Sequence, residues 1–179
     1  VGAAQPGHFA ASGNTVIYSG PAEWTFRRMI LHYAKLCALA GGVDAFLIGS
    51  ELRGLTSLRS SATHFPFVAA LQQLASEVKA ILPTAKISYA ADWSEYFGHQ
   101  PGDGSNDVLF HLDPFWASPN VDFIGIDNYM PLSDWRDGEN HLDYLDARRS
   151  IYDRDYLKSQ ITAGEGFDYF YARTADRDL

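Results

Sequence analysis

The sequence has one cysteine and few basic residues, and both scarcities narrow its possible functions. Cys37 is the only cysteine among 179 residues, which excludes an internal disulfide, and its apolar helical surroundings are typical of a small core residue. Lys and Arg number 14 against 22 Asp and Glu, so the formal net charge is −8. Nucleic acids and anionic membranes both require a basic face, so we expect neither as a partner. A neutral or cationic ligand fits better.

Long apolar runs and cofactor motifs are also missing. No stretch is long enough to span a bilayer, and none has the charged start and apolar run of a signal peptide, so we expect no membrane insertion. Neither glycine-rich phosphate fingerprint follows an expected strand, so no nucleotide cofactor is expected. Asp103, Ser105 and Asp107 alternate as in a calcium loop. The glycine and terminal glutamate of an EF-hand are absent, so no metal site is expected either.

The composition is that of an ordinary globular protein, with 46% hydrophobic and 20% charged residues. Its length predicts a single domain over residues 1–179. The glycine- and proline-rich first twenty residues predict a loop, with a short strand over 14–18. Helices are predicted over 21–40 and 66–82, each beginning with proline. In the first of them the apolar positions, Met29 and Tyr33 among them, predict an inward face, and Arg27, Arg28 and Lys35 are expected on the flanks or the outer face.

The stretch Val43–Leu55 organises the rest of the chain. An apolar run over 45–48 predicts a strand covered on both faces, as in a parallel sheet. Gly49 and Ser50 end that run and place Glu51 where the strand leaves the core. Desolvation there would raise the pKa of the Glu51 carboxyl, which suits a catalytic acid. Alternatively, Glu51 forms a salt bridge with Arg53 or caps the next helix.

Two further strands end in the same way. The predicted strand over 86–91 leads into Asp92 and Trp93, and the strand over 121–129 ends in Asp127, Asn128 and Tyr129. Helices alternating with buried strands predict a parallel α/β fold. A closed eightfold barrel needs about 250 residues, so the chain is either a small open sheet or a consecutive part of a barrel. The remaining predictions are a loop over 98–106, helices over 107–116 and 144–158, a strand or turn over 161–166, and a helical turn over 167–171.

Four runs carry a resemblance to a known family. They are RRMILHYAKLC (27–37), GGVDAFLIGSELRGL (41–55), ISYAADWSEY (87–96) and DFIGIDNYMPLSDW (122–135). Together they resemble the TIM-barrel-like domain of gene transfer agent and phage tail-tip proteins. The resemblance implies a glycoside-hydrolase-like (β/α)8 barrel, of which this chain would be a partial barrel comprising the central βα units.

The resemblance also implies roles for particular residues. Glu51 corresponds to the general acid/base after the fourth barrel strand, and Ser50 stands where an asparagine usually binds the sugar 2-hydroxyl. The second glutamate of the family, the nucleophile, is expected beyond Leu179. Within the chain, the possible carboxylate partners of Glu51 in a retaining or inverting pair are Asp92, Glu95, Asp127 and Glu165. The residues expected to bind substrate are Ser50, Asp92, Trp93, Asp127, Asn128, Tyr129 and Trp135, whereas Trp116 is expected in the core.

The function that follows is cleavage or binding of a cell-envelope glycan by a phage-like tail protein. The expected partners are carbohydrate and other tail proteins, and the expected location is the particle tail, assembled in the bacterial cytoplasm. These 179 residues alone are expected to have little or no hydrolase activity. One alternative is a catalytically inactive carbohydrate-binding or structural module of the tail tip. Another is an open-sheet enzyme that acts on a small molecule.

Overall fold

The computed structural model describes residues 2–95, 97–129, 135–145 and 150–161. The chain forms two compact units, residues 1–128 and residues 129–179, and each is described by itself below. The single domain over residues 1–179 stays a prediction.

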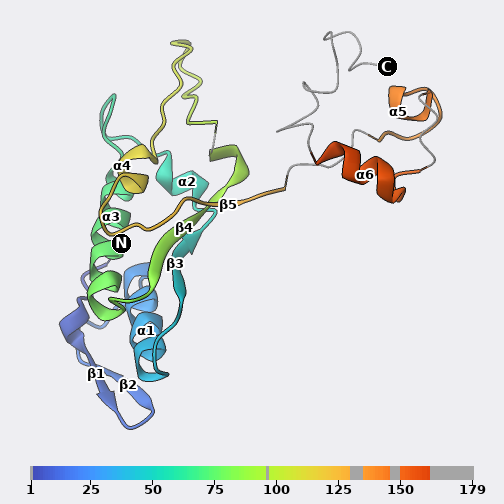
Figure 1. Ribbon diagram of the computed structural model, residues 1–179. Coiled ribbons are helices and arrows are strands. Elements are labelled where there is room, and N and C mark those ends of the chain that lie inside the picture. Colours follow the sequence, from blue (N-terminus) through green and yellow to red (C-terminus); the bar gives the residue numbers. More distant parts are fainter. Residues whose placement is uncertain (1, 96, 130–134, 146–149, 162–179) are drawn as a thin grey trace. The chain divides into compact units, whose positions relative to one another are not determined.

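The first unit opens with a β-hairpin where mostly loop was expected. A short 3-10 helix, η1 (Pro6–His8), leads into β1 (Phe9–Ser12), which pairs antiparallel with β2 (Thr15–Tyr18) (Figure 1). The expected strand over 14–18 is therefore confirmed, whereas β1 was missed. Its sequence, Phe-Ala-Ala-Ser, has a single large apolar side chain and gives no clear strand signal.

Helix α1 (Phe26–Leu39) begins later than predicted, because Thr25 is its N-cap and accepts a hydrogen bond from the backbone N–H of Arg28. Its buried face also differs from the prediction. Arg27 is buried, where it donates to the backbone oxygen of Ala4 (2.5 Å) and forms an ion pair with Glu77. The buried residues of α1 are Arg27, Ile30, Leu31 and Ala34, and the residues wrongly expected inside are Met29 and Tyr33, which are exposed.

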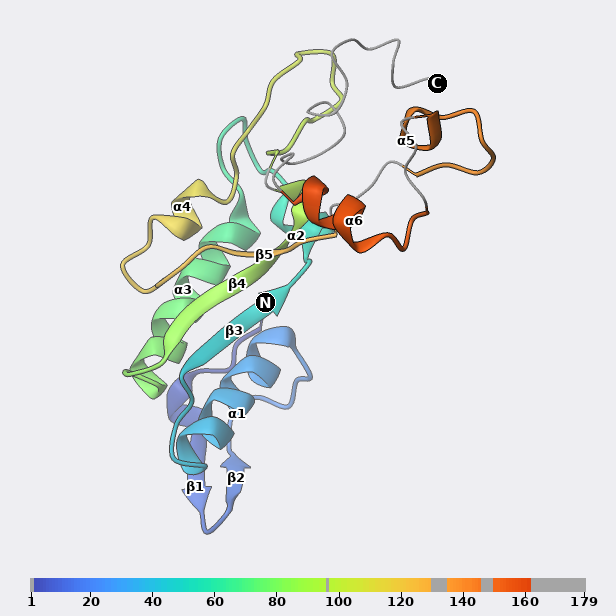
Figure 2. The same cartoon turned by 45° about the vertical axis from the view of Figure 1, so that its right-hand side comes forward.

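A parallel sheet follows, with strand order β3-β4-β5 (Figures 1 and 2). Its strands are β3 (Ala45–Ser50), β4 (Lys86–Asp92) and β5 (Gly125–Asp127). The short helix α2 (Arg53–Thr56) and the long helix α3 (Pro66–Ile81) connect β3 to β4, so the helix predicted over 66–82 is confirmed. Helices α1 and α3 contact each other, and both pack against β3. The fold is mixed α/β with a parallel sheet.

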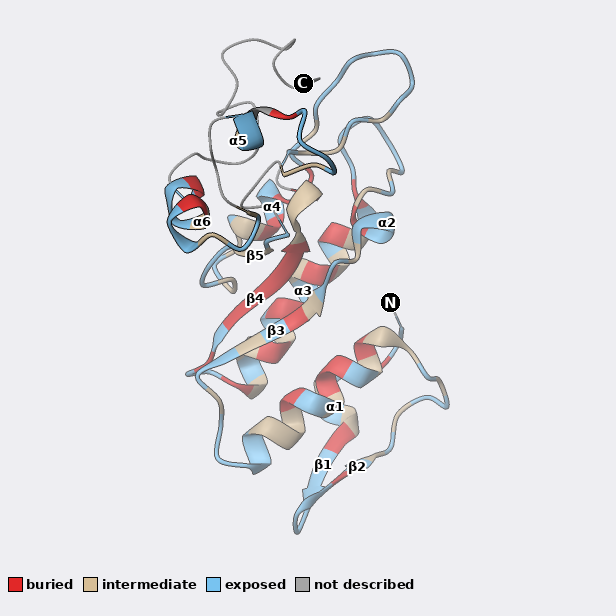
Figure 3. Ribbon diagram, turned by 90° about the vertical axis from the view of Figure 1, so that its right-hand side faces the viewer, coloured by how far each residue is buried: buried red, intermediate tan, exposed pale blue. Residues whose placement is uncertain are grey.

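Burial differs between the strands (Figure 3). Every residue of β4 from Ile87 to Ala91 is buried. The strand over 45–48 was predicted to be covered on both faces, and this is wrong for β3, in which Ile48 is buried but Leu47 is 47% exposed. The reason is that β3 is an edge strand of this sheet and only one of its faces packs against the helices in the described part of the chain.

The connection between β4 and β5 contains less helix than expected. It comprises a 3-10 turn, η2 (Trp93–Glu95), and α4 (Asp113–Trp116), instead of a helix over 107–116. Leu109 pairs with His99 through two backbone hydrogen bonds of 2.8 and 2.9 Å, which draws the preceding residues into a hairpin. Residues 98–106 form the predicted loop.

Among its described residues the second unit contains two short helices, α5 (Leu142–Leu145) and α6 (Arg154–Gln160), and residues 150–153 are not helical, so the single helix predicted over 144–158 is wrong. Asp153 caps α6 by accepting hydrogen bonds from Asp155 and Tyr156, and so begins a new helix. The elements predicted over 161–166 and 167–171, apart from Ile161, lie outside the described residues, as does Glu165. None of the described helices is long and apolar enough to cross a membrane.

Asp122 connects three elements at the amino end of the sheet. One of its oxygens, Oδ2, accepts hydrogen bonds from the backbone of Ile87 and from Lys79 Nζ, both at 2.8 Å, and Oδ1 lies 3.4 Å from Lys86 Nζ. The hydrogen bond from Ile87, followed by the contact with Lys79, lowers the pKa of Asp122 to about 2. The carboxylate therefore joins the segment before β5 to β4 and α3.

We expect Asp122→Ala to lower the melting temperature at pH 7 more than Asp44→Ala, which removes an exposed carboxylate just before β3. The folded-state pKa of Asp122 lies below the value of about 3.9 for an unfolded aspartate, so its stabilisation is complete above about pH 5 and is lost as the pH falls towards 2. The difference between wild type and Asp122→Ala should close over that range in circular-dichroism melts. Equal melting temperatures of the two variants at pH 7 would contradict this role.

Candidate functional site

The carboxyl ends of the three parallel strands lie side by side. Asp92 of β4 is the register partner of Asp127 of β5, and Ser50 at the end of β3 donates a hydrogen bond of 2.7 Å to Asp127 Oδ2. We call this edge the rim, and it comprises Ser50, Glu51, Asp92, Asp127 and Asn128. The sheet therefore brings together polar residues that are 77 positions apart in the sequence.

Glu51 has an unusual backbone conformation. Its φ is +53°, in the left-handed region, and its N–H donates to the backbone oxygen of Ala90 at 2.8 Å. For a residue other than glycine such a conformation costs on the order of 1–3 kcal/mol and is concentrated at functional sites. The Glu51 side chain is exposed, so the expected desolvation by apolar neighbours is wrong. Nor does it pair with Arg53, which instead contacts Asp92 at 3.6 Å.

Asp92 is held as a carboxylate. Its Oδ1 accepts hydrogen bonds from the backbone N–H of Ser94 (2.9 Å) and from the Ser94 hydroxyl, and it faces the Arg53 guanidinium. The Ser94 hydroxyl makes the largest contribution to lowering the pKa of Asp92, and Arg53 adds to it. At neutral pH this residue can accept hydrogen bonds from a ligand but cannot act as a proton donor.

The expected aromatic platforms have different surroundings. Trp93 is half-buried and its ring meets Phe97 edge-on, with 6.0 Å between centroids. Tyr129 is 65% exposed and begins the second unit. Trp135 belongs to the second unit. Its ring packs against the His141 ring, with 4.7 Å between the two centroids, so part of its surface is covered. Sugar stacking by these rings stays a prediction, whereas Trp116 packs against the core as expected.

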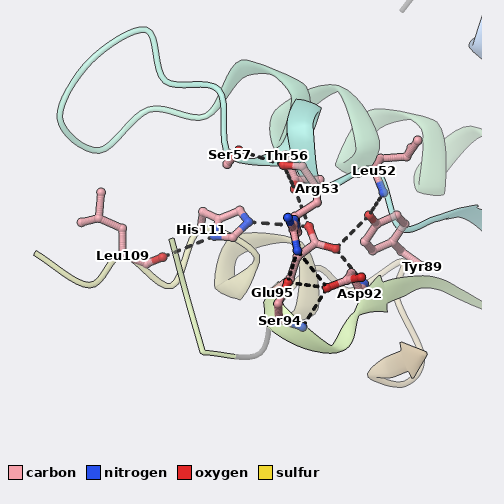
Figure 4. A network of polar contacts seen from close by, with 10 residues as sticks. All are labelled: Leu52, Arg53, Thr56, Ser57, Tyr89, Asp92, Ser94, Glu95, Leu109 and His111. Carbon is pink, nitrogen blue, oxygen red and sulfur yellow. Dashed lines mark hydrogen bonds and ion pairs between the residues drawn. The ribbon is translucent and has the colours of Figure 1, made fainter. Parts of the chain in front are cut away.

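A buried polar network lies beneath the rim and was not expected (Figure 4). At its centre is Glu95, whose side chain is fully buried. Glu95 Oε2 accepts hydrogen bonds from the backbone N–H of Asp92 (2.8 Å) and from the Tyr89 hydroxyl (3.2 Å), and Oε1 accepts one from the Thr56 hydroxyl. His111 Nε2 lies 3.7 Å from Oε1. Glu95 therefore joins α2, β4 and the connection to β5.

The network also reaches the residue after Glu51. The Tyr89 hydroxyl accepts a hydrogen bond of 2.6 Å from the backbone N–H of Leu52 while it donates to Glu95. Burial, and then the negative charge of Glu95, raise the pKa of Tyr89, so the hydroxyl keeps its proton. Glu95 and Tyr89 thus hold the backbone on both sides of the rim, next to Glu51 and at Asp92.

Glu95 is charged although it is buried. Desolvation acts to raise its pKa, but the nearby His111 imidazole and the hydrogen bonds from Thr56, the Asp92 N–H and Tyr89 outweigh it, and the net pKa is lowered. Glu95 was one of the possible carboxylate partners of Glu51. Its burial among these groups indicates a structural role instead. A glutamate three residues after Asp92 was visible in the sequence, but nothing there indicated that Thr56, Tyr89 and His111 would surround it.

The described part of the chain contains no group of three or more His, Cys, Asp or Glu side chains that could hold a metal ion. In comparisons with known proteins, the family model of the GTA TIM-barrel-like domain matches residues 24–179, which is most of the chain. No curated protein matches the sequence.

We expect Tyr89→Phe to reduce the free energy of unfolding by about 1–3 kcal/mol, because it leaves the Leu52 N–H and a Glu95 oxygen without their buried partner. Tyr33→Phe is the matched control, since Tyr33 is 55% exposed and no hydrogen bond to its hydroxyl is seen among the described residues. Urea unfolding measures both. Hydrogen exchange of the Leu52 amide should accelerate in Tyr89→Phe alone, and unchanged exchange there would contradict the contact.

Proposed function

Because the chain belongs to the family of GTA TIM-barrel-like domains, we propose that it is a consecutive part of a (β/α)8 barrel in a gene transfer agent or phage-like tail protein, and that its rim binds an envelope glycan. The observation that carries the proposal is the meeting of Ser50, Asp92 and Asp127 at one edge of the sheet. In barrel enzymes the active site lies at this carboxyl end of the strands.

The open side of the sheet supports the partial barrel. Leu47 of β3, Ile124 and Ile126 are 47%, 63% and 38% exposed, although all three belong to apolar strand sequences. An edge strand with exposed apolar residues tends to pair with another strand, and a barrel removes such edges by closure. In the proposed parent protein, further barrel strands cover these residues.

Glu51 is the proposed general acid/base. It is exposed at the rim, so a ligand can reach its carboxylate, and a hydrogen bond to β4 fixes its strained backbone. Asp92, which is ionised, and Asn128 are the proposed acceptors and donors for sugar hydroxyl groups. Retaining hydrolysis requires a second carboxyl group about 5–5.5 Å from the first, and we propose that the rest of the barrel supplies it.

A second candidate is a glycan-binding module without catalysis. The observation that favours it is that the other rim carboxylates already have partners within the chain. Asp92 contacts Ser94 and Arg53, and Asp127 accepts a hydrogen bond from Ser50. On either proposal the partners are an envelope glycan and other tail proteins, and the location is the tail of a phage-like particle.

We expect the chain alone to bind soluble glycan strands of peptidoglycan and to leave chromogenic glycosides uncleaved. Asp92→Asn should weaken binding by about tenfold, because it removes a charged acceptor, whereas Asp107→Asn, at an exposed position directly after the 98–106 loop, should not. Calorimetry measures the affinity. Absence of binding would refute the proposal that the rim binds glycan. Cleavage of the chromogenic glycosides by the chain alone, if Glu51→Gln abolishes it, would refute the proposal that the nucleophile lies elsewhere in the barrel.

The complete parent protein separates the two candidates. Cleavage that is lost in Glu51→Gln, with binding retained, identifies a glycosidase. Binding without cleavage, both by the unmodified parent protein and by its Glu51→Gln variant, identifies a binding module.

A further inference from the structure

A hollow lies beside the rim, next to α2. It is a cavity of about 370 Å³, within the range of about 300–1,000 Å³ that is usual for ligand sites. The buried side chains of Glu95 and His111 are among its lining residues, and the others come from α2, η2 and the start of the hairpin that follows. Those used in the argument are Arg53, Gly54, Ser57, Ser94, His99 and Gln100.

Arg53 connects this cavity to the rim. Its guanidinium donates a hydrogen bond of 2.8 Å to the Ser94 hydroxyl and lies 3.6 Å from Asp92 Oδ1, so two residues that line the cavity also contact a rim carboxylate (Figure 4). A ligand chain bound at Asp92 therefore has the cavity as its next polar surface.

The charges around the cavity favour an uncharged ligand. The positive charge of Arg53 is balanced by Asp92, and Glu95 is buried and surrounded by donors. Burial, followed by the nearby His111 and Arg59, lowers the pKa of His99, so its imidazole is neutral at pH 7. A free anion would face Glu95, and a free cation would face Arg53, so neither is well matched.

The remaining polar groups fit hydroxyl groups. The Gln100 amide can both donate and accept hydrogen bonds, whereas the hydroxyls of Ser57 and Ser94, which donate to the Arg53 backbone oxygen and to Asp92, can accept from a sugar hydroxyl. A ligand with many hydroxyl groups can satisfy both functions at once.

Gly54 keeps one wall of the cavity open. It lies inside α2, where glycine is a poor helix former, and an added Cβ there would meet no atom within 4 Å. Neither a positive φ nor a close neighbour requires glycine at this position. Its missing side chain leaves space that belongs to the cavity.

We propose that this cavity is a subsite for one uncharged sugar ring of the same glycan chain that lies on the rim. The inference rests on the proposed function. It assigns a ligand-binding role to Arg53, Ser57 and Gln100, for which the sequence predicted no such role, and it makes the site longer than the strand ends alone.

The test is an NMR titration of the ¹⁵N-labelled chain with a tetramer of N-acetylglucosamine. We expect amide shifts at Gly54, Ser94 and Gly98 in addition to those at Ser50 and Glu51. Gly54→Leu fills the cavity from a position with free space, so it should remove the shifts at Ser94 and Gly98 and weaken binding by about tenfold while the rim shifts remain.

The matched control is Gly7→Leu, because an added Cβ at that glycine also meets open space. Gln100→Ala, at an exposed position, is a second variant that cannot be confused with misfolding and should weaken binding severalfold. Wild-type affinity in both Gly54→Leu and Gln100→Ala, with rim shifts present, would overturn the subsite and leave the rim proposal intact. No shift anywhere in the wild-type chain would overturn both, and shifts at the cavity alone would support the subsite and overturn the rim.

Discussion

The buried carboxylate of Glu95 is the constraint on which the carboxyl end of the sheet depends. An unpaired charge in a protein interior costs several kcal/mol, so a buried glutamate is stable only when donors surround it. Here the donors are Tyr89 and the Asp92 N–H of β4 and Thr56 of α2, while Glu95 itself belongs to η2. Three segments, β4, α2 and η2, must therefore reach the same point before the charge is stable, and their meeting fixes the surface above it.

This constraint extends to Glu51 through Tyr89. The phenol links the Glu95 carboxylate to the backbone N–H of Leu52, directly after the residue with left-handed geometry. A strained residue keeps its conformation only if its neighbours determine it. The buried Glu95 thus fixes the backbone that carries the exposed Glu51. Glu51 presents its carboxylate to solvent, whereas Glu95 stabilises the backbone around it.

The sequence predicted the elements better than it predicted their surroundings. Helix α3, strand β4 and the gathering of strand ends followed from periodicity, proline placement and the geometry of parallel strands. The buried face of α1 did not, because Arg27 is neutralised by Glu77, 50 positions away. The helix expected over 107–116 lost most of its length to the pairing of Leu109 with His99. The Glu95 network was equally inaccessible, since its members come from separate segments and each looks ordinary alone.

The hydrogen bond between Ser50 and Asp127 joins strands that are not neighbours. Adjacent strands are about 4.8 Å apart, so the backbones of β3 and β5 would be separated by roughly twice that distance in a flat sheet. Side chains standing upright on such a sheet would not meet. Their contact therefore requires the carboxyl end of the sheet to bend, or the two side chains to lean, across β4, where β3 also has an irregular register. A bend of this sense is the one that the proposed closed barrel of strands would continue.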